Sequence, residues 1–321
     1  MTQANAALAR PRAAGPVARL LGAQLAIGAA AIFARYALTG AGPLAVSALR
    51  LGIATLALAF VVRSVTRLGW RRELAFAAAG CALAVHFATW IASLRYTSVA
   101  ISTLLVTTTP LWTELYAIVV ERRPPSRAFA IAMACASGGV ALIVLPGSAP
   151  APVAGHTMLG AALALVGSFA IGAYLLVVRD AGQETATARL GTPQIVVRTY
   201  GWAMIVLAIA AAFAHEGSPV PSDRIAWGGI LAMALISQLL GHTLLNAALG
   251  SFAPSTVALA TLLEPAFAAV LATLAFGEAL TPTTIAGGLL VLTAVAVVLV
   301  RSTDKPRVEA ATGVAGDRAR K

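Results

Sequence analysis

The chain has 321 residues, of which 59% are hydrophobic and only 11% are charged, and its mean hydropathy is +0.86. These values predict a protein whose surface faces lipid and exclude an ordinary water-soluble domain. The formal net charge of +11 alone would fit a nucleic-acid-binding protein, but the basic residues are distributed by membrane side, which excludes nucleic acid as a partner.

Apolar segments of bilayer-crossing length follow one another along almost the whole chain. About 20 apolar residues cross the hydrocarbon core as a helix, and the short connections leave no room for a soluble domain. The predicted fold class is an all-α integral membrane protein with ten transmembrane helices. The predicted spans are residues 17–38, 43–62, 74–94, 99–120, 127–145, 157–178, 192–213, 226–249, 254–277 and 280–300.

Arginine and lysine are abundant on one predicted side of the membrane and rare on the other. The rich side receives both ends of the chain and the connections around 63–72, 122–127 and 179–189, whereas the other side receives only Arg95 and Arg224. Because positively charged segments are retained in the cytoplasm, we expect both termini there. The preference for arginine over lysine fits a bacterial genome, and hence the bacterial inner membrane.

Two terminal segments fall outside the predicted spans. Residues 1–16 are rich in alanine and arginine and form a predicted cytoplasmic N-terminal segment. The long span that follows, with further spans behind it, favours an uncleaved first helix over a removed signal peptide. Residues 301–321 are polar and lack periodicity, which predicts a disordered cytoplasmic tail.

The two halves of the chain resemble each other. Prolines and glutamates at similar spacing carry the match, with Pro110, Glu121 and Pro125 corresponding to Pro265, Glu278 and Pro282. The predicted domains are a first five-helix repeat at 17–145, a connecting loop at 146–156 and a second repeat at 157–300. Five spans per repeat is an odd number, so the second repeat must enter the membrane with opposite polarity. Inverted repeats with proline-interrupted helices are typical of alternating-access transporters.

The segments Arg95–Gly139 and Ala253–Gly288 resemble the EamA-type members of the drug/metabolite transporter superfamily. Each has a proline within a helix, a glutamate near the helix end and then a helix rich in small residues. The resemblance covers residues 17–300 and implies a ten-helix bundle with a central substrate cavity that exports small metabolites, amino acids or drugs. The halves depart from each other before the proline, where Thr109 stands in the first and Glu264 in the second.

Glu264 is the most prominent ionisable residue inside a predicted span. A charged side chain at the centre of a membrane helix costs roughly 2.5–3.5 kcal/mol on insertion scales, so it needs a partner or a water-filled cavity. Glu264 directly precedes Pro265, which loosens the helix. We interpret it as a cavity carboxylate that binds a cationic group or a proton; the alternative is a structural bond to a neighbouring helix.

Polar side chains in two other spans add candidates for the cavity. Gln238, His242 and Asn246 follow one another at i, i+4 spacing, which places them on one face of an α-helix. His86 and Trp90 repeat this spacing in the third span. A buried histidine serves either as a proton carrier or as a packing residue, and Trp90 faces either a cavity or lipid.

The fourth span aligns Thr107, Pro110 and Glu114 on one helical face, and Glu114 is expected to pair with an intramembrane arginine. Arg50 and Arg198 lie at mirror depths in spans two and seven. Each of them either extends to the headgroups or lines the cavity and attracts an anionic group. Because Gln194 and Trp202 share its helical face, Arg198 ranks above Arg50 as a candidate.

These residues predict a secondary active exporter that works by alternating access on a small-molecule substrate, with proton coupling through Glu264 or a histidine. No GxxxxGK[ST] motif occurs, so ATP hydrolysis by this chain is not the expected driver. No cofactor or metal site is expected. The alternatives are a channel, a non-transporting membrane scaffold and, least favoured, a membrane-embedded enzyme. Membrane lipid is an expected partner, and a homodimer is compatible with the sequence.

Overall fold

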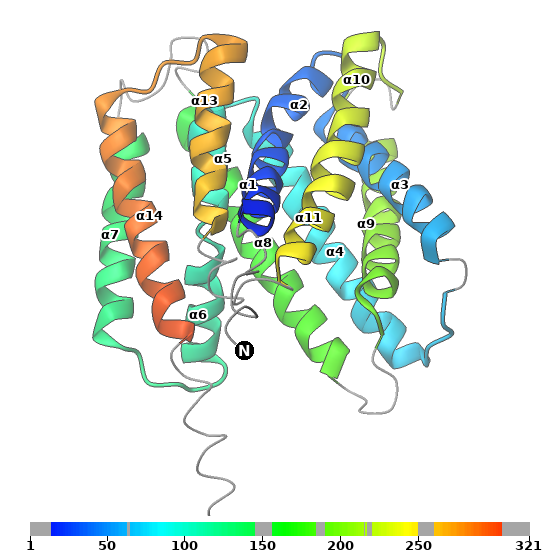
Figure 1. Cartoon of the computed structure of the whole chain (residues 1–321), viewed down its shortest axis with the longest axis horizontal. Coiled ribbons are helices and arrows are strands. Elements are labelled where there is room, and N and C mark those ends of the chain that lie inside the picture. The colour runs from blue at the N-terminus through cyan, green and yellow to red at the C-terminus, as the bar shows by residue number, and fades with distance from the viewer. Residues whose placement is uncertain are drawn as a thin grey trace, which may run out of the picture.

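The computed structural model describes residues 14–62, 65–144, 156–183, 190–214, 216, 220–249 and 260–303. Every regular element in these ranges is a helix, which confirms the all-α prediction. Figure 1 shows the helices gathered side by side in one bundle. The predicted N-terminal segment, the connecting loop and the tail lie almost entirely outside the described residues.

In the first half, two of the predicted spans are each divided into two helices. The elements are α1 (Ala14–Gly28), α2 (Ala30–Ala37), α3 (Pro43–Val62), α4 (Trp70–Ser93), α5 (Val99–Val106), α6 (Thr109–Val119) and α7 (Arg127–Val144). The division between α1 and α2 falls at Ala29, and α5 is separated from α6 by Thr107 and Thr108.

In the second half, one long helical segment contains a π-helix at its centre. The elements are α8 (Thr157–Gln183), α9 (Thr192–Ala214), α10 (Arg224–Ala232), the π-helix η2 (Met233–Gly241), α11 (His242–Leu249), the 3₁₀ turn η3 (Thr261–Leu263), α13 (Glu264–Phe276) and α14 (Pro282–Thr303). Elements α10, η2 and α11 follow one another without a gap.

Within the described ranges, six helical segments are long and apolar enough to cross a bilayer. They are Gly15–Ala37, Pro43–Val62, Trp70–Ser93, Thr157–Val178, Pro193–Ala214 and Arg224–Leu245. Three shorter apolar helical segments accompany them: Arg127–Ile143, Thr261–Phe276 and Pro282–Val297. Helices satisfy their backbone hydrogen bonds internally, as a chain inside lipid requires, so the architecture is that of a multi-pass membrane protein.

Both intramembrane prolines stand in the first turn of a helix that begins after an interruption. Pro110 follows the Thr107–Thr108 gap at the start of α6, and Pro265 follows the 3₁₀ turn at the start of α13. Proline has no N–H for the preceding turn, and its ring clashes with the carbonyl four residues earlier. Each helix therefore restarts at its proline.

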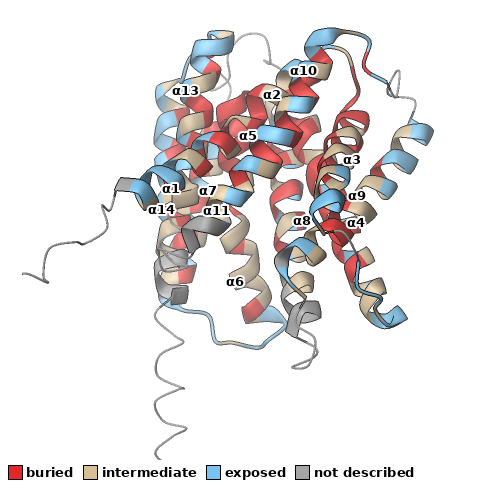
Figure 2. Cartoon of the chain, turned by 45° about the vertical axis from the view of Figure 1, so that its right-hand side comes forward, coloured by how far each residue is buried: buried red, intermediate tan, exposed pale blue. Residues whose placement is uncertain are grey.

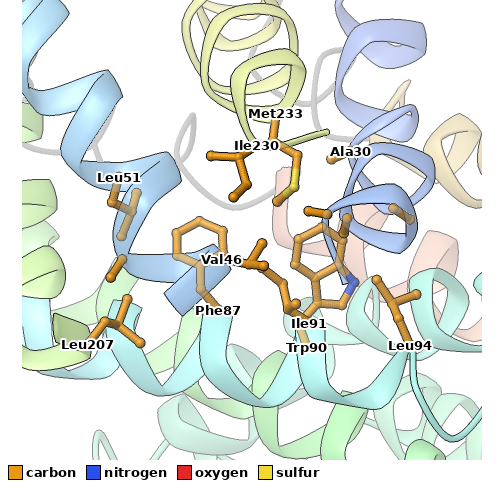
Figure 3. Close-up of a cluster of buried hydrophobic side chains, with 14 of the residues drawn as sticks. Ala30, Val46, Leu51, Phe87, Trp90, Ile91, Leu94, Leu207, Ile230 and Met233 are labelled. Carbon is orange, nitrogen blue, oxygen red and sulfur yellow. The ribbon is translucent and has the colours of Figure 1, made fainter. Parts of the chain in front are cut away.

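The largest hydrophobic core draws on α2, α3, α4, α9 and the segment from α10 to η2. Figure 3 shows Phe87 and Trp90 of α4 projecting from one helix toward Val46, Ile230 and Met233. This core lies where the two halves of the chain meet.

Burial is uneven along the helices. In α5 every residue from Val99 to Leu105 is buried, whereas in α6, beyond the interruption, Leu111 and Ala117 are the buried residues (Figure 2). The same trend is seen in α3, whose buried residues lie in the first part of the helix, from Pro43 to Ala54. The end of the bundle that contains α5 and the start of α3 is therefore the more tightly packed end.

Helices α7 and α14 pack against each other at one edge of the bundle (Figure 1). Gly139 and Gly287 meet there, and a Cβ added to either one would lie 2.6 Å from the carbonyl oxygen of the other. The absence of a side chain at both positions permits this approach, as small residues do between membrane helices. The contact is reciprocal, since each half contributes an equivalent surface.

Candidate functional site

Arg50 lies inside the bundle, and its partners come from the other half of the chain. It belongs to α3, and its side chain is only 3% exposed. Its Nη2 donates a hydrogen bond to Oε1 of Gln238 on η2, and Nε2 of Gln238 donates to the hydroxyl of Tyr200 on α9. Gln238 and Tyr200 are themselves buried. The amide of Gln238 is thus fixed from both sides and holds the guanidinium in place.

Aromatic rings of α4 form the other wall around Arg50. The guanidinium carbon lies 4.3 Å from the ring centre of Phe87 and 5.8 Å from that of Trp90. Both distances fall within the range of cation–π attraction. We call Arg50, Gln238, Tyr200, His86, Phe87 and Trp90 the central polar cluster.

His86 packs against Trp90 and forms a hydrogen bond to α8. Its ring is stacked with that of Trp90, at 6.2 Å between centres and 6° between planes. Its Nδ1 lies 2.9 Å from the carbonyl oxygen of Gly167 on α8. A carbonyl can only accept, so Nδ1 carries a hydrogen and donates it. This bond connects the cluster to α8 of the second half.

The positive charge of Arg50 has no carboxylate partner in the described part of the chain. Its Nε and Nη1 are buried and have no hydrogen-bond acceptor there. The ionisable side chains close enough to interact with its charge are Tyr200, His86 and His242, none of which is an acid of the Asp or Glu type. An unneutralised buried charge of this kind is costly and, inside a membrane protein, marks a functional site.

Arg198 lies in a different environment, near the start of α9. Its Nε is 3.4 Å from a carboxylate oxygen of Glu73, its Nη1 donates to Oε1 of Gln194 at 3.0 Å, and its Nη2 donates to the carbonyl of Thr66. Trp202 also donates to Glu73, at 3.0 Å. Arg198 and Trp202, which share the helical face identified from the sequence, thus both bond to Glu73 at the start of α4.

Arg35 also has an acidic partner. Its Nη2 lies 2.8 Å from Oε1 of Glu278 and donates to the carbonyl of Thr97 at 3.2 Å. The second carboxylate oxygen of Glu278 accepts from the backbone N–H of Val99 at 3.0 Å. Burial raises the pKa of Glu278, and Arg35 and the Val99 N–H partly oppose this shift. These bonds tie α2, the start of α5 and the turn before α14 together.

Glu264 lies at the interruption in the second half, apart from the central polar cluster. It is half-buried, and no hydrogen bond or ion pair joins its carboxylate to another described residue. The backbone of α1 comes close at Gly28, where an added Cβ would lie 3.1 Å from the carbonyl oxygen of Glu264. At the equivalent place in the first half, hydroxyls of Thr108 and Thr109 bond to that of Ser168 at 2.9 and 3.2 Å.

The remaining predicted residues are dispersed. The Thr107 hydroxyl donates to the carbonyl of Leu104 at 2.7 Å. Glu114 lies 3.7 Å from Arg123, beyond the end of its own helix, rather than beside an intramembrane arginine as expected. His242 is half-buried at the start of α11. The side chain of Asn246 lies outside the described residues.

The structure therefore brings together Gln238, His86 and Trp90 from the predicted set and adds Arg50, Tyr200 and Phe87. Glu264, Glu114 and Arg198 lie elsewhere. The expected stripe of Gln238 and His242 assumed an α-helix, whereas Gln238 lies in a π-helix, a form often found at functional sites. Because a π-helix has more residues per turn than an α-helix, Gln238 and His242 do not lie on the same face at i, i+4 spacing. Gln238 is buried at 3% exposure, whereas His242 is half-buried.

A bundle of apolar helices of bilayer-crossing length defines a multi-pass membrane protein, here with a polar cluster buried among the helices. The sequence profile of the EamA-like transporter family matches residues 17–145 and 158–300. The chain belongs to this family, an EamA-type branch of the drug/metabolite transporter superfamily. Members of this family are transporters, and the match makes the chain a membrane transporter of the drug/metabolite transporter type.

Solved structures show a similar fold. A crystal structure of a protein 16% identical in sequence superposes with a TM-score of 0.59 and covers 91% of this chain and 99% of the other. At this identity the likeness concerns the fold alone. A comparison with curated proteins found no match.

Proposed function

We propose that this protein is a secondary active exporter that moves a small metabolite, amino acid or drug across the bacterial inner membrane by alternating access. The observation that carries the proposal is the central polar cluster. It joins α3 and α4 of the first half to α8, α9 and η2 of the second at mid-span. A site built between the two repeats is where a transporter exposes its substrate alternately to the two sides.

In this proposal ten transmembrane helices form two inverted repeats. The pattern of packing supports it, because contacts recur when the halves are exchanged. Helix α4 packs on α8, and its counterpart in the second half, the segment from α10 to α11, packs on α1 and α2. Likewise, α5 and α6 pack on α8, and their counterpart α13 packs on α1 and α2. Two further contacts each join a helix to its own counterpart in the other half: α3 contacts α9, and α7 contacts α14. The reciprocal Gly139–Gly287 contact agrees with this symmetry.

Both termini are placed in the cytoplasm, in accordance with the basic connections. The tightly packed end of the bundle, with Arg35 and Glu278, then faces outward, and the loosely packed α6 faces the cytoplasm. This distribution is expected of an inward-facing state, in which the outer end of the bundle is closed. Transport would require the bonds at the outer end to open.

Glu264 is the proposed proton carrier. It precedes the proline at which the helix restarts, and its carboxylate bonds to no described residue, so protonation would meet no competing partner. A carboxylate that gains and loses a proton during the cycle couples export to the proton gradient.

The test compares small molecules in the medium of cells that express the wild type, Glu264→Gln, Glu121→Gln or no transporter, at matched membrane levels. We expect the wild type and the Glu121→Gln control to export the same compounds. Glu264→Gln should lose the response of export to an imposed pH gradient. Counterflow in vesicles then separates a carrier from a channel, since only a carrier exchanges substrate against substrate. A medium identical to that of empty cells would refute the exporter.

A further inference from the structure

We propose that the substrate carries a carboxylate group, which binds Arg50 and neutralises it, while the apolar part of the substrate contacts the rings of Phe87 and Trp90. This inference rests on the proposed function and specifies the substrate class of the same site. It concerns an organic acid whose recognised group is the carboxylate, with no requirement for an amino group.

Arg50 differs from Arg35 and Arg198 in having no acidic partner among the described residues. Arg35 and Arg198 each meet a glutamate, at 2.8 and 3.4 Å, although both lie near helix ends. Arg50 is only 3% exposed and meets no carboxylate among the described residues. A guanidinium keeps its charge in proteins, so burial without a counter-ion carries a cost that function must justify. A substrate anion supplies the missing charge at the moment of binding.

The guanidinium of Arg50 has a fixed orientation and, among the described residues, free donors. Gln238 occupies one nitrogen of Arg50 and is itself held by Tyr200, so the guanidinium is oriented before any ligand arrives. Nε and Nη1 remain without an acceptor. Each of these nitrogens shares an edge of the planar guanidinium with Nη2, which has a second N–H, and such an edge matches the two oxygens of a carboxylate. Pre-organised donors of this kind bind an anion with little loss of side-chain entropy.

The side chains around Arg50 are mostly aromatic and apolar. Phe87 and Trp90 present aromatic faces beside the charge, and Val46, Ile230 and Met233 gather around them (Figure 3). Among the described residues, no acidic side chain near Arg50 would hold an ammonium group. The cluster therefore favours an acid with an apolar or aromatic body over a cation or a highly polar sugar.

The first test identifies, by chemical class, the cell metabolites that appear in the medium. It compares cells that express the wild type, Arg50→Lys, Arg50→Gln or Arg71→Gln, a control at an exposed arginine. We expect the compounds exported by the wild type and by Arg71→Gln to share a carboxylate. Arg50→Gln should reduce their export by about tenfold or more, since a charge-assisted bond is lost, and Arg50→Lys should fall between them.

Two results would overturn the inference while the proposed function stands: export of compounds without a carboxylate, or equal export of carboxylates by Arg50→Gln. Failure of the wild type to export anything would instead remove the proposed function.

A second test needs no substrate and separates a binding role from a structural one. The melting temperature of purified Arg50→Gln should equal or exceed that of the wild type, because the variant removes an unpaired buried charge and keeps a donor for Gln238. A clear fall in melting temperature would identify Arg50 as structural and would overturn the inference.

Discussion

The arginines at the ends of the bundle and the arginine at its centre are held in opposite ways. Arg35 and Arg198 are bound to Glu278 and Glu73, and each also donates to a backbone carbonyl. Arg50 is held by one neutral amide and two aromatic faces. The difference indicates that the end pairs join helices, whereas the centre keeps a charge available. The protein itself neutralises the two end arginines; in the proposal above, a substrate carboxylate neutralises Arg50.

An acidic side chain beside Arg50 would remove the difference between this arginine and the two at the ends. In Gln238→Glu, a carboxylate would take the place of the amide and neutralise the guanidinium internally. We expect the melting temperature to rise and export to fall by about 100-fold, since competition of about 2.7 kcal/mol corresponds to that factor. Export measured in vesicles, together with thermal unfolding, checks both parts.

Gln194→Glu is the matched control for that variant. Gln194 accepts from Arg198 as Gln238 accepts from Arg50, but Arg198 already has Glu73. A second carboxylate there should change export little. Equal loss of export in both variants would show that any new charge in the bundle is harmful and would contradict the distinction between the two arginines.

Removing a paired arginine should have the opposite effect from removing Arg50. Arg35→Gln leaves Glu278 with its carboxylate largely buried, at 10% side-chain exposure, and without its cation. Breaking a fully buried pair costs about 3–5 kcal/mol, and partial exposure of Arg35 reduces this to about 2 kcal/mol. We expect a melting temperature lower by about 3 °C. An unchanged melting temperature would mean that the pair does not hold the outer end together.

Arg198→Gln should be milder, although Arg198 itself is only 4% exposed. Its partner Glu73 is 37% exposed and regains water when the pair is broken. We expect a loss of about 1 kcal/mol in stability, with export retained. Loss of export with a normal melting temperature would instead place Arg198 in the transport path, as its helical face predicted.

The sequence was sufficient for the helical fold because hydropathy and backbone satisfaction in lipid leave few alternatives. Pro110 and Pro265 also marked the interrupted helices, since the missing N–H acts locally. The exact break at Thr107 and Thr108, and the one at Ala29 where no proline stands, depend on packing between helices.

The site was harder to predict because its bonds join residues distant in the sequence. Arg50 and Gln238 are 188 positions apart, and Arg198 and Glu73 are 125 apart. Ranking arginines by neighbours on their own helix favoured Arg198, whose acidic partner lies on another helix. The π-helix around Gln238 has no signature in composition either, so a helical face drawn at α-spacing misplaced His242 relative to it.

The stability of the paired end should also depend weakly on pH. Burial raises the pKa of Glu278 above its ordinary value of 4.5 despite Arg35, so the folded state binds a proton more tightly than the unfolded state. Stability contributed by this group is therefore present at low pH and is lost as pH rises through the raised pKa. Glu278→Gln cannot ionise; its amide replaces one of the two oxygens that accept from Arg35 and the Val99 N–H by an NH2 group, and this loss does not vary with pH. We expect its melting temperature, relative to the wild type, to increase as pH rises above 4.5; a difference that is constant with pH would contradict a raised pKa.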